Sequence, residues 1–341
     1  EGSVASNTFS GLLFRVMAGS MVAITLMFLF NVYLTFWLGW PSFMSFLADQ
    51  GWFGLAPLQT PLEGAEVTQG WIQFASYIAC VALVALYVFA TPHRPLRADA
   101  DRYAGMAAYV VRAAFWSVLL VGLADMLISM LRVEGFLSSI IGEDLTKEMG
   151  RPQFRGSYVH YPLIGLSLVI AAFSRGLGFI WLAMLVVFAE FQIVISRFVF
   201  SYEQAFMGDL VRFWYAALFL FASAYALVAE GHVRVDVFYA GFSHRRKAWA
   251  NLIGTVFLGW PLCWIILTQG MWAKGSSINS PLLSFEISQS GFGMYVKYLM
   301  AGFLVVFAVS MIMQFSSYFL NCVADLRDEP GGRKTPAESG H

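Results

Sequence analysis

Two carboxylates inside long apolar stretches are the first candidates for chemistry in this sequence. Asp125 and Glu190 each stand in an apolar run that is long enough to cross a bilayer. A charged side chain costs about 2.5–3.5 kcal/mol at the centre of a membrane. The two residues therefore belong either to an ion path or to paired contacts at a helix–helix or subunit interface. We favour the second interpretation, because signs of discontinuous transport helices are sparse.

Proline and glycine mark one irregular helix. Pro261 is the only proline well inside an apolar run, and Gly259 stands beside it. Proline removes a backbone hydrogen bond and its ring clashes with the preceding turn. We therefore predict a kink at this position.

A short polar connector is the second candidate site. In the motif HVRVD, the polar residues His232, Arg234 and Asp236 alternate with valines. A period of two fits an extended or interfacial segment with one face in lipid or protein. The basic run at 245–247 follows, and we interpret it as an anchor that keeps this connector in the cytoplasm.

The sequence contains no residue pattern for catalysis or cofactor binding. A haem held by two histidines needs a pair on facing membrane helices. The five histidines instead fall in connectors, at the ends of apolar runs or in the tail: His93, His160, His232, His244 and His341. No P-loop, HExxH or GxSxG pattern occurs, and the three cysteines lack metal-binding spacing. We predict that the protein is not an enzyme and has no catalytic, cofactor-binding or metal-binding residue.

The composition requires lipid around most of the chain. Of 341 residues, 59% are hydrophobic and 12% are charged, which is about half the charged fraction of soluble proteins. Runs of about 20 apolar residues cross a bilayer as helices, and a net charge of zero gives no sign of a nucleic-acid partner. We predict an all-α polytopic membrane protein with about eight transmembrane helices and short amphipathic helices at the interfaces. The predicted spans are 11–40, 70–91, 105–131, 158–174, 177–199, 208–229, 248–272 and 294–320.

The positions of the basic residues predict the orientation. With the N-terminus in the cytoplasm, most arginines and lysines fall in the connectors after the second, fourth and sixth spans and in the tail. Segment 132–157 is an exception, with four basic and four acidic residues, and we expect it to be a small folded periplasmic cap. An even number of spans then predicts a multi-pass membrane protein with both termini in the cytoplasm.

The second half of the chain resembles a known membrane-protein family. The motifs that carry the resemblance are VISRFVF at 194–200, the amphipathic SYEQAFMGDLVRFW after it, AYALVAEGHVRVDVFY at 224–239 and SHRRKAWANLIGT at 243–255. Together they make the stretch from about 179 to 325 similar to the small membrane subunit, of the DctQ type, of tripartite ATP-independent periplasmic (TRAP) transporters.

The resemblance also selects particular residues, to which we assign structural roles. Arg197 belongs to the arginine–aromatic pair that closes the first of the four family spans. An acidic residue, usually glutamate, follows the amphipathic segment in the family, and Asp209 stands there. The motif of His232, Arg234 and Asp236 comes after the second span.

The resemblance implies a place in the bacterial inner membrane, partners and an overall function. In this family the small subunit pairs with a large, ion-coupled permease, to which a periplasmic solute-binding protein delivers organic acids. The large subunit carries the transport core and the sodium sites, and the small one braces the fixed scaffold against lipid. We divide the chain into an N-terminal four-helix extension at 1–174, a DctQ-like domain at 175–325 and a cytoplasmic tail at 326–341.

Two other functions stay open at this point. The chain could be an accessory or scaffold subunit of another bacterial inner-membrane complex, respiratory or photosynthetic, that binds only lipid and protein. It could also be an autonomous secondary transporter, in which case vesicles containing this chain alone would take up solute. Neighbouring genes for a large permease and a periplasmic binding protein would favour the TRAP subunit.

Overall fold

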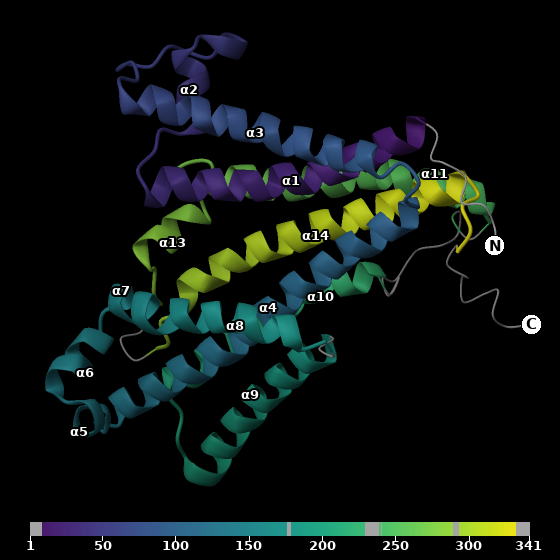
Figure 1. Ribbon diagram of the computed structural model, residues 1–341. Helices are drawn as coiled ribbons and strands as arrows, with labels where there is room; N and C mark the ends of the chain where they lie inside the picture. The colour runs from purple at the N-terminus through teal and green to yellow at the C-terminus, as the bar shows by residue number, and fades with distance from the viewer. Residues whose placement is uncertain (1–8, 176–178, 229–238, 240, 289–292, 332–341) are drawn as a thin grey trace, which may run out of the picture. The chain divides into compact units, whose positions relative to one another are not determined.

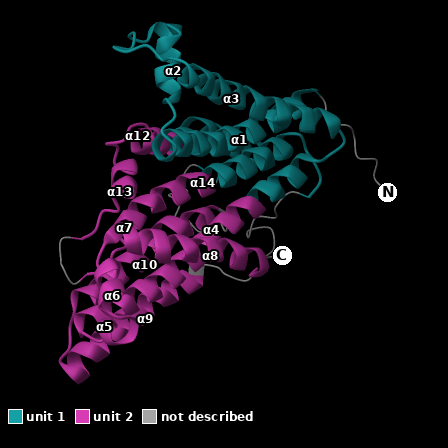
Figure 2. Cartoon of the chain, turned by 60° about the vertical axis from the view of Figure 1, so that its left-hand side comes forward, with its two compact units in different colours: residues 1–104, 234–262, 312–341 teal, residues 105–233, 263–311 magenta. Residues whose placement is uncertain are grey.

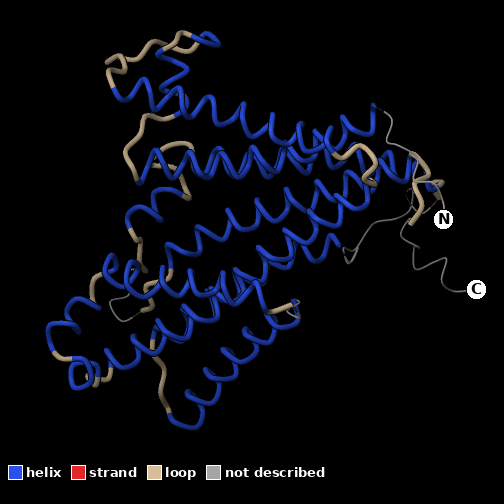
Figure 3. The backbone as a smooth tube through the Cα atoms, in the orientation of Figure 1, coloured by secondary structure: helices blue, strands red, loops and turns tan. Residues whose placement is uncertain are grey.

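A computed structural model describes residues 9–175, 179–228, 239, 241–288 and 293–331. Within these residues the regular secondary structure is helical throughout, and no strand occurs (Figure 3). The all-α prediction is confirmed. The helices follow from the long apolar runs, because a chain in lipid must satisfy its own backbone hydrogen bonds.

Eight helical segments of the described chain are long and apolar enough to cross a membrane. This agrees with the predicted number. Their bounds are Phe9–Trp37, Ala65–Ala90, Leu96–Val133, Pro152–Phe173, Ile180–Phe200, Ala205–Leu227, His244–Met271 and Lys297–Leu326. The largest difference lies in the third segment, which begins at Leu96 rather than at 105. Its first turns carry charged residues, so hydropathy alone places the helix start too late.

The helices form two compact units (Figure 2). Unit 1 comprises residues 1–104, 234–262 and 312–341, and unit 2 comprises residues 105–233 and 263–311. Each unit takes residues from both sides of position 174, where the sequence analysis divides the chain. That division rests on the family resemblance and stays a prediction.

Unit 1 is built on two long helices, α1 (Phe9–Trp37) and α3 (Ala65–Ala90), which pack along each other. Gly19 permits this contact, because a Cβ there would lie 2.7 Å from Cγ1 of Val84. The unit also contains α2 (Phe43–Asp49), η1 (Trp52–Gly54), α11 (His244–Gly254), η3 (Thr255–Gly259) and parts of α4 (Leu96–Val133), α12 (Trp260–Met271) and α14 (Lys297–Leu326). Its core includes Trp260 and Phe319.

Unit 2 contains most of α4 (Leu96–Val133), together with α9 (Phe179–Phe200), which packs on α10 (Ala205–Val228) (Figure 1). Trp214 anchors the core by donating its indole N–H to the Val118 carbonyl at 2.8 Å. Gly122 makes room for that ring, since a Cβ there would lie 2.6 Å from Nε1 of Trp214. Unit 2 also contains the short helices between positions 137 and 160, α8 (Tyr161–Phe173), α13 (Asn279–Ser284) and parts of α12 and α14.

The segment predicted to be a folded cap consists of short helices. These are α5 (Leu137–Ile141), α6 (Glu143–Met149) and α7 (Pro152–Arg155). The prediction that this segment is folded is confirmed, and its periplasmic side stays a prediction. Through η2 (Gly156–His160) it continues directly into α8.

A π-helical turn precedes a proline in each unit. In η3 the Trp260 N–H bonds the Thr255 carbonyl, just before Pro261. In η2 the Tyr161 N–H bonds the carbonyl of Gly156, just before Pro162. The wider turn accommodates a ring that would otherwise clash with the carbonyl four residues earlier. The structure therefore has a π-helical turn at the position where the sequence predicts a kink.

Candidate functional site

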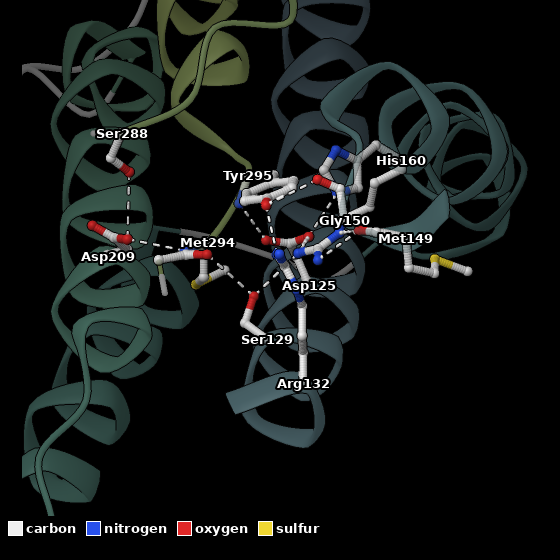
Figure 4. Close-up of polar contacts among 12 residues, drawn as sticks. Asp125, Ser129, Arg132, Met149, Gly150, His160, Asp209, Ser288, Met294 and Tyr295 are labelled. Carbon is white, nitrogen blue, oxygen red and sulfur yellow. Dashed lines mark hydrogen bonds and ion pairs between the residues drawn. The ribbon is translucent and has the colours of Figure 1, made fainter. Parts of the chain in front are cut away.

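Asp125 is the centre of a buried polar network in unit 2 (Figure 4). Its side chain is fully buried, and its carboxylate accepts hydrogen bonds from three residues. Oδ1 accepts from Arg155 Nη1 at 2.9 Å and from His160 Nε2 at 3.1 Å. Oδ2 accepts from the backbone N–H of Tyr295 at 2.7 Å. One carboxylate on α4 therefore holds α7, η2 and the segment before α14.

The guanidinium group of Arg155 donates hydrogen bonds to three residues. Nη1 donates to Asp125 and to Ser129 Oγ at 3.1 Å, while Nε and Nη2 donate to the Met149 carbonyl at 3.0 and 2.9 Å. The guanidinium carbon lies 4.0 Å from the centroid of the Tyr295 ring. Met149 is the last residue of α6, so the arginine also caps the carbonyl end of a helix, where a cation is favoured.

The contacts of His160 define its tautomer. A carboxylate only accepts hydrogen bonds, so Nε2, which faces Asp125, carries a proton. Nδ1 lies 2.9 Å from the hydroxyl of Tyr298, which has no other hydrogen-bond partner among the described residues. The network is complete when this hydroxyl donates to an unprotonated Nδ1. This arrangement of hydrogen bonds gives both ring nitrogens of His160 a partner.

Tyr295 connects the network to segment 132–157. Its hydroxyl accepts from Arg132 Nη1 at 2.5 Å and donates to the Gly150 carbonyl at 3.1 Å. Each buried donor then has an acceptor, and proton uptake or ion binding here would break an existing hydrogen bond. In a low-dielectric interior such a complete network is stiff. The network therefore serves to hold helices together.

Asp209, on α10, makes a second buried contact in unit 2. Oδ2 accepts from the backbone N–H of Met294 at 3.0 Å and from the Ser288 hydroxyl at 3.5 Å (Figure 4). Arg212 donates to Oδ1 at 3.2 Å, but its side chain is 73% exposed. Met294 directly precedes Tyr295, so two aspartates on different helices fix one stretch of backbone.

We expect Asp209→Ala to lower the free energy of unfolding by about 1–3 kcal/mol, because it leaves the buried N–H of Met294 without an acceptor. Asp209→Asn keeps an acceptor oxygen and should cost less. Arg212→Ala is the control, and we expect about 0–1 kcal/mol for this exposed pair. SDS-induced unfolding of the purified protein in mixed micelles measures all three. Equal effects of the Ala and Asn variants would contradict the assigned contact.

A third contact joins the connectors at the end of α4 and between α9 and α10. Tyr202 donates its hydroxyl to Glu134 Oε1 at 2.6 Å. Desolvation and this hydrogen bond to the carboxylate raise the pKa of Tyr202 to about 12. The phenol therefore stays protonated and donating throughout the neutral range.

The other residues selected from the sequence lie elsewhere. Arg197 and Glu190 are both exposed on α9 and take no part in the network. Arg197 lies 3.7 Å from Glu203, whereas Glu190 has no hydrogen bond or ion pair with any described residue. Three residues of the signature lie outside the described residues: His232, Arg234 and Asp236.

Sequence reasoning missed the partners of Asp125. It assigned Arg155 to a small folded periplasmic cap and His160 to the end of a span, and it did not predict that both side chains are 0% exposed. It did not consider Tyr295 or Tyr298. The one available signal was Arg155 itself, a basic residue directly before an apolar run that also contains a histidine.

Comparison with known proteins identifies part of the chain. Residues 183–318 match the family model of the DctQ component of tripartite ATP-independent periplasmic transporters. This segment of the chain is similar to the DctQ component. The resemblance drawn from the sequence motifs is therefore confirmed. No curated protein and no solved structure matches the chain.

The DctQ match covers some residues of the buried network and leaves others outside. The matched residues begin within α9 and end within α14, so they include Asp209, Tyr295 and Tyr298. Asp125 and Arg155 precede the match. The network therefore fastens helices outside the DctQ segment to the DctQ segment itself, and DctQ is a transporter component rather than a family of known catalysts.

Proposed function

We propose that this small subunit of a TRAP transporter acts as a non-catalytic brace for the large permease subunit. The DctQ match at 183–318 supports the transporter assignment. The observation that carries the bracing role is the fully paired network around Asp125. A transport path needs groups that bind and release a solute, whereas these groups already bind one another.

The two N-terminal spans that contribute to unit 2 enlarge the brace. Asp125 lies on the third candidate span, and Arg155 and His160 lie at the start of the fourth. Their contacts with Tyr295 and Tyr298 make these spans one rigid piece with part of the DctQ segment. A wider and stiffer frame resists displacement while a partner's transport domain moves.

The membrane orientation and the partners belong to the same proposal. Both termini lie in the cytoplasm, because most basic residues of the connectors then lie on that side. The network and segment 132–157 then lie at the periplasmic end, where a solute-binding protein docks. Organic acids are the substrates and sodium is the coupling ion, with the sodium sites on the large subunit, as the family resemblance implies.

Reconstitution tests this function. We expect uptake of an organic acid, driven by a sodium gradient, only in vesicles that hold both this chain and the large permease and that receive the binding protein. Vesicles with either membrane subunit alone are the controls and should take up none. Uptake by this chain alone would make it an autonomous transporter and contradict the proposal.

A further inference from the structure

The outer face of α9 is apolar and largely uncovered by the rest of the chain. Leu182 and Ala189 are buried in the core of unit 2, whereas Val187, Phe191 and Phe198 are 64%, 59% and 78% exposed. Only 11% of the apolar window of this helix is buried. Either lipid or another protein must cover such a face.

Glu190 interrupts this face at the middle of the span. Because α9 runs from Phe179 to Phe200, the carboxylate lies about 15–17 Å from either end at 1.5 Å per residue. A glutamate side chain cannot reach the membrane surface over that distance, whereas a long side chain near a helix end can. Glu190 is exposed and has no partner among the described residues.

Two comparisons within the chain show what lipid alone requires. The apolar window of α3 is also only 11% buried, and its outer face carries apolar residues such as Ile78, Leu83 and Leu86 without a charge in its middle. Arg197, the other charge on α9, lies three residues from the helix end and faces Glu203. Glu190, in contrast, lies at the middle of the span and has no charged partner among the described residues.

We propose that the α9 face around Glu190 binds a transmembrane helix of the large permease, and that a hydrogen-bond-donating side chain of that helix pairs with the Glu190 carboxylate. An ionised carboxylate only accepts hydrogen bonds, and lipid tails offer no donor at this depth. If a second copy of this chain packed here with the same face, it would bring a like charge opposite an ionised Glu190, so charge complementarity favours a different chain. The identity of that chain rests on the proposed function.

Photo-crosslinking of the native complex maps this face. A photoreactive residue at Val187 or Val194, one turn before and one turn after Glu190, should crosslink to the large permease. The crosslinked permease helix should carry an arginine, lysine, histidine, asparagine or glutamine at matching depth. The same residue at Leu83 on α3 is the matched control and should crosslink to lipid. Permease crosslinks from Leu83 but not from the α9 positions would overturn the proposal.

Substitution of Glu190 should weaken the complex without weakening the isolated chain. We expect Glu190→Leu to reduce co-purification of the permease at least tenfold, and Glu190→Gln, which keeps an acceptor oxygen, to reduce it less. The isolated Glu190→Leu chain should be as stable as the unmodified chain or more stable, since leucine suits an apolar environment better. Unchanged co-purification of the Leu variant would refute the face assignment.

The outcomes separate this inference from the proposed function. If the chain co-purifies with the permease regardless of residue 190, the transporter assignment stands and the proposal that the α9 face binds the permease is wrong. If Val187 and Val194 crosslink to a multi-pass protein that is not a permease, the α9 face stands as an interface and the proposed function fails.

Discussion

Arg155→Met should lower the free energy of unfolding by about 3–5 kcal/mol, because it leaves the fully buried carboxylate of Asp125 without its cation. The same change removes two donors from the carbonyl of Met149 and one from Ser129. Asp125 is buried in the folded protein whether or not Arg155 is present. The free energy lost with the ion pair is therefore not regained by hydration of the carboxylate. The free energy of unfolding, measured by SDS titration in mixed micelles, gives the size of the effect.

A neighbouring arginine provides the control for this prediction. Arg151 pairs with Glu148 at 2.8 Å, but the two side chains are 62% and 36% exposed. Arg151→Met should therefore cost about 0–1 kcal/mol. Removing both charges with Asp125→Leu and Arg155→Met should recover part of the stability, since no charge is then left buried. Equal losses for Arg151→Met and Arg155→Met would show that the buried pair does not stabilise unit 2.

The fold follows from the sequence largely because lipid imposes a simple rule. Any helix that crosses the bilayer needs about 20 apolar residues, so the eight spans can be counted from the runs alone. The ends are harder to predict. The first turns of α4 contain Arg97 and Asp99, which lower the local hydropathy although the helix already begins at Leu96.

The candidate site could be predicted only in part. Asp125 was recognisable, because an acidic residue inside a span is costly. Its partners were not, since Arg155 is 30 residues away and Tyr295 is 170 residues away in the sequence. The donor from Tyr295 is a backbone N–H, which every residue type except proline supplies. No residue pattern marks such a contact, and packing alone determines it.

The two units have a similar buried contact, and both contacts involve α4. In unit 1, Arg15 donates to Asp99 at 2.7 Å and to the carbonyl of Thr91, the C-cap residue after α3, at 2.7 Å. In unit 2, Arg155 does the same with Asp125 and the end of α6. Each arginine neutralises an aspartate of α4 and caps the carbonyl end of another helix. All four charged residues precede the DctQ segment.

We expect Asp99→Ala to destabilise unit 1 by about 3–5 kcal/mol, because Arg15 is 0% exposed and would keep a buried charge without a counter-charge. Arg94 also pairs with Asp99, at 2.7 Å, but it is 25% exposed and can reach water. Asp101→Ala, two residues further along α4 at an exposed position, is the matched control and should change little.

Hydrogen exchange measured by mass spectrometry locates this loss. Amides around Thr91 and Leu96, where α3 ends and α4 begins, should exchange faster in the Asp99→Ala variant. The amide of Tyr295 should keep its protection, because its acceptor Asp125 belongs to unit 2. The Arg155→Met variant should reverse this pattern. If either variant loosened both sets of amides equally, the two buried pairs would belong to one cooperative structure, and the division into separately fastened units would be wrong.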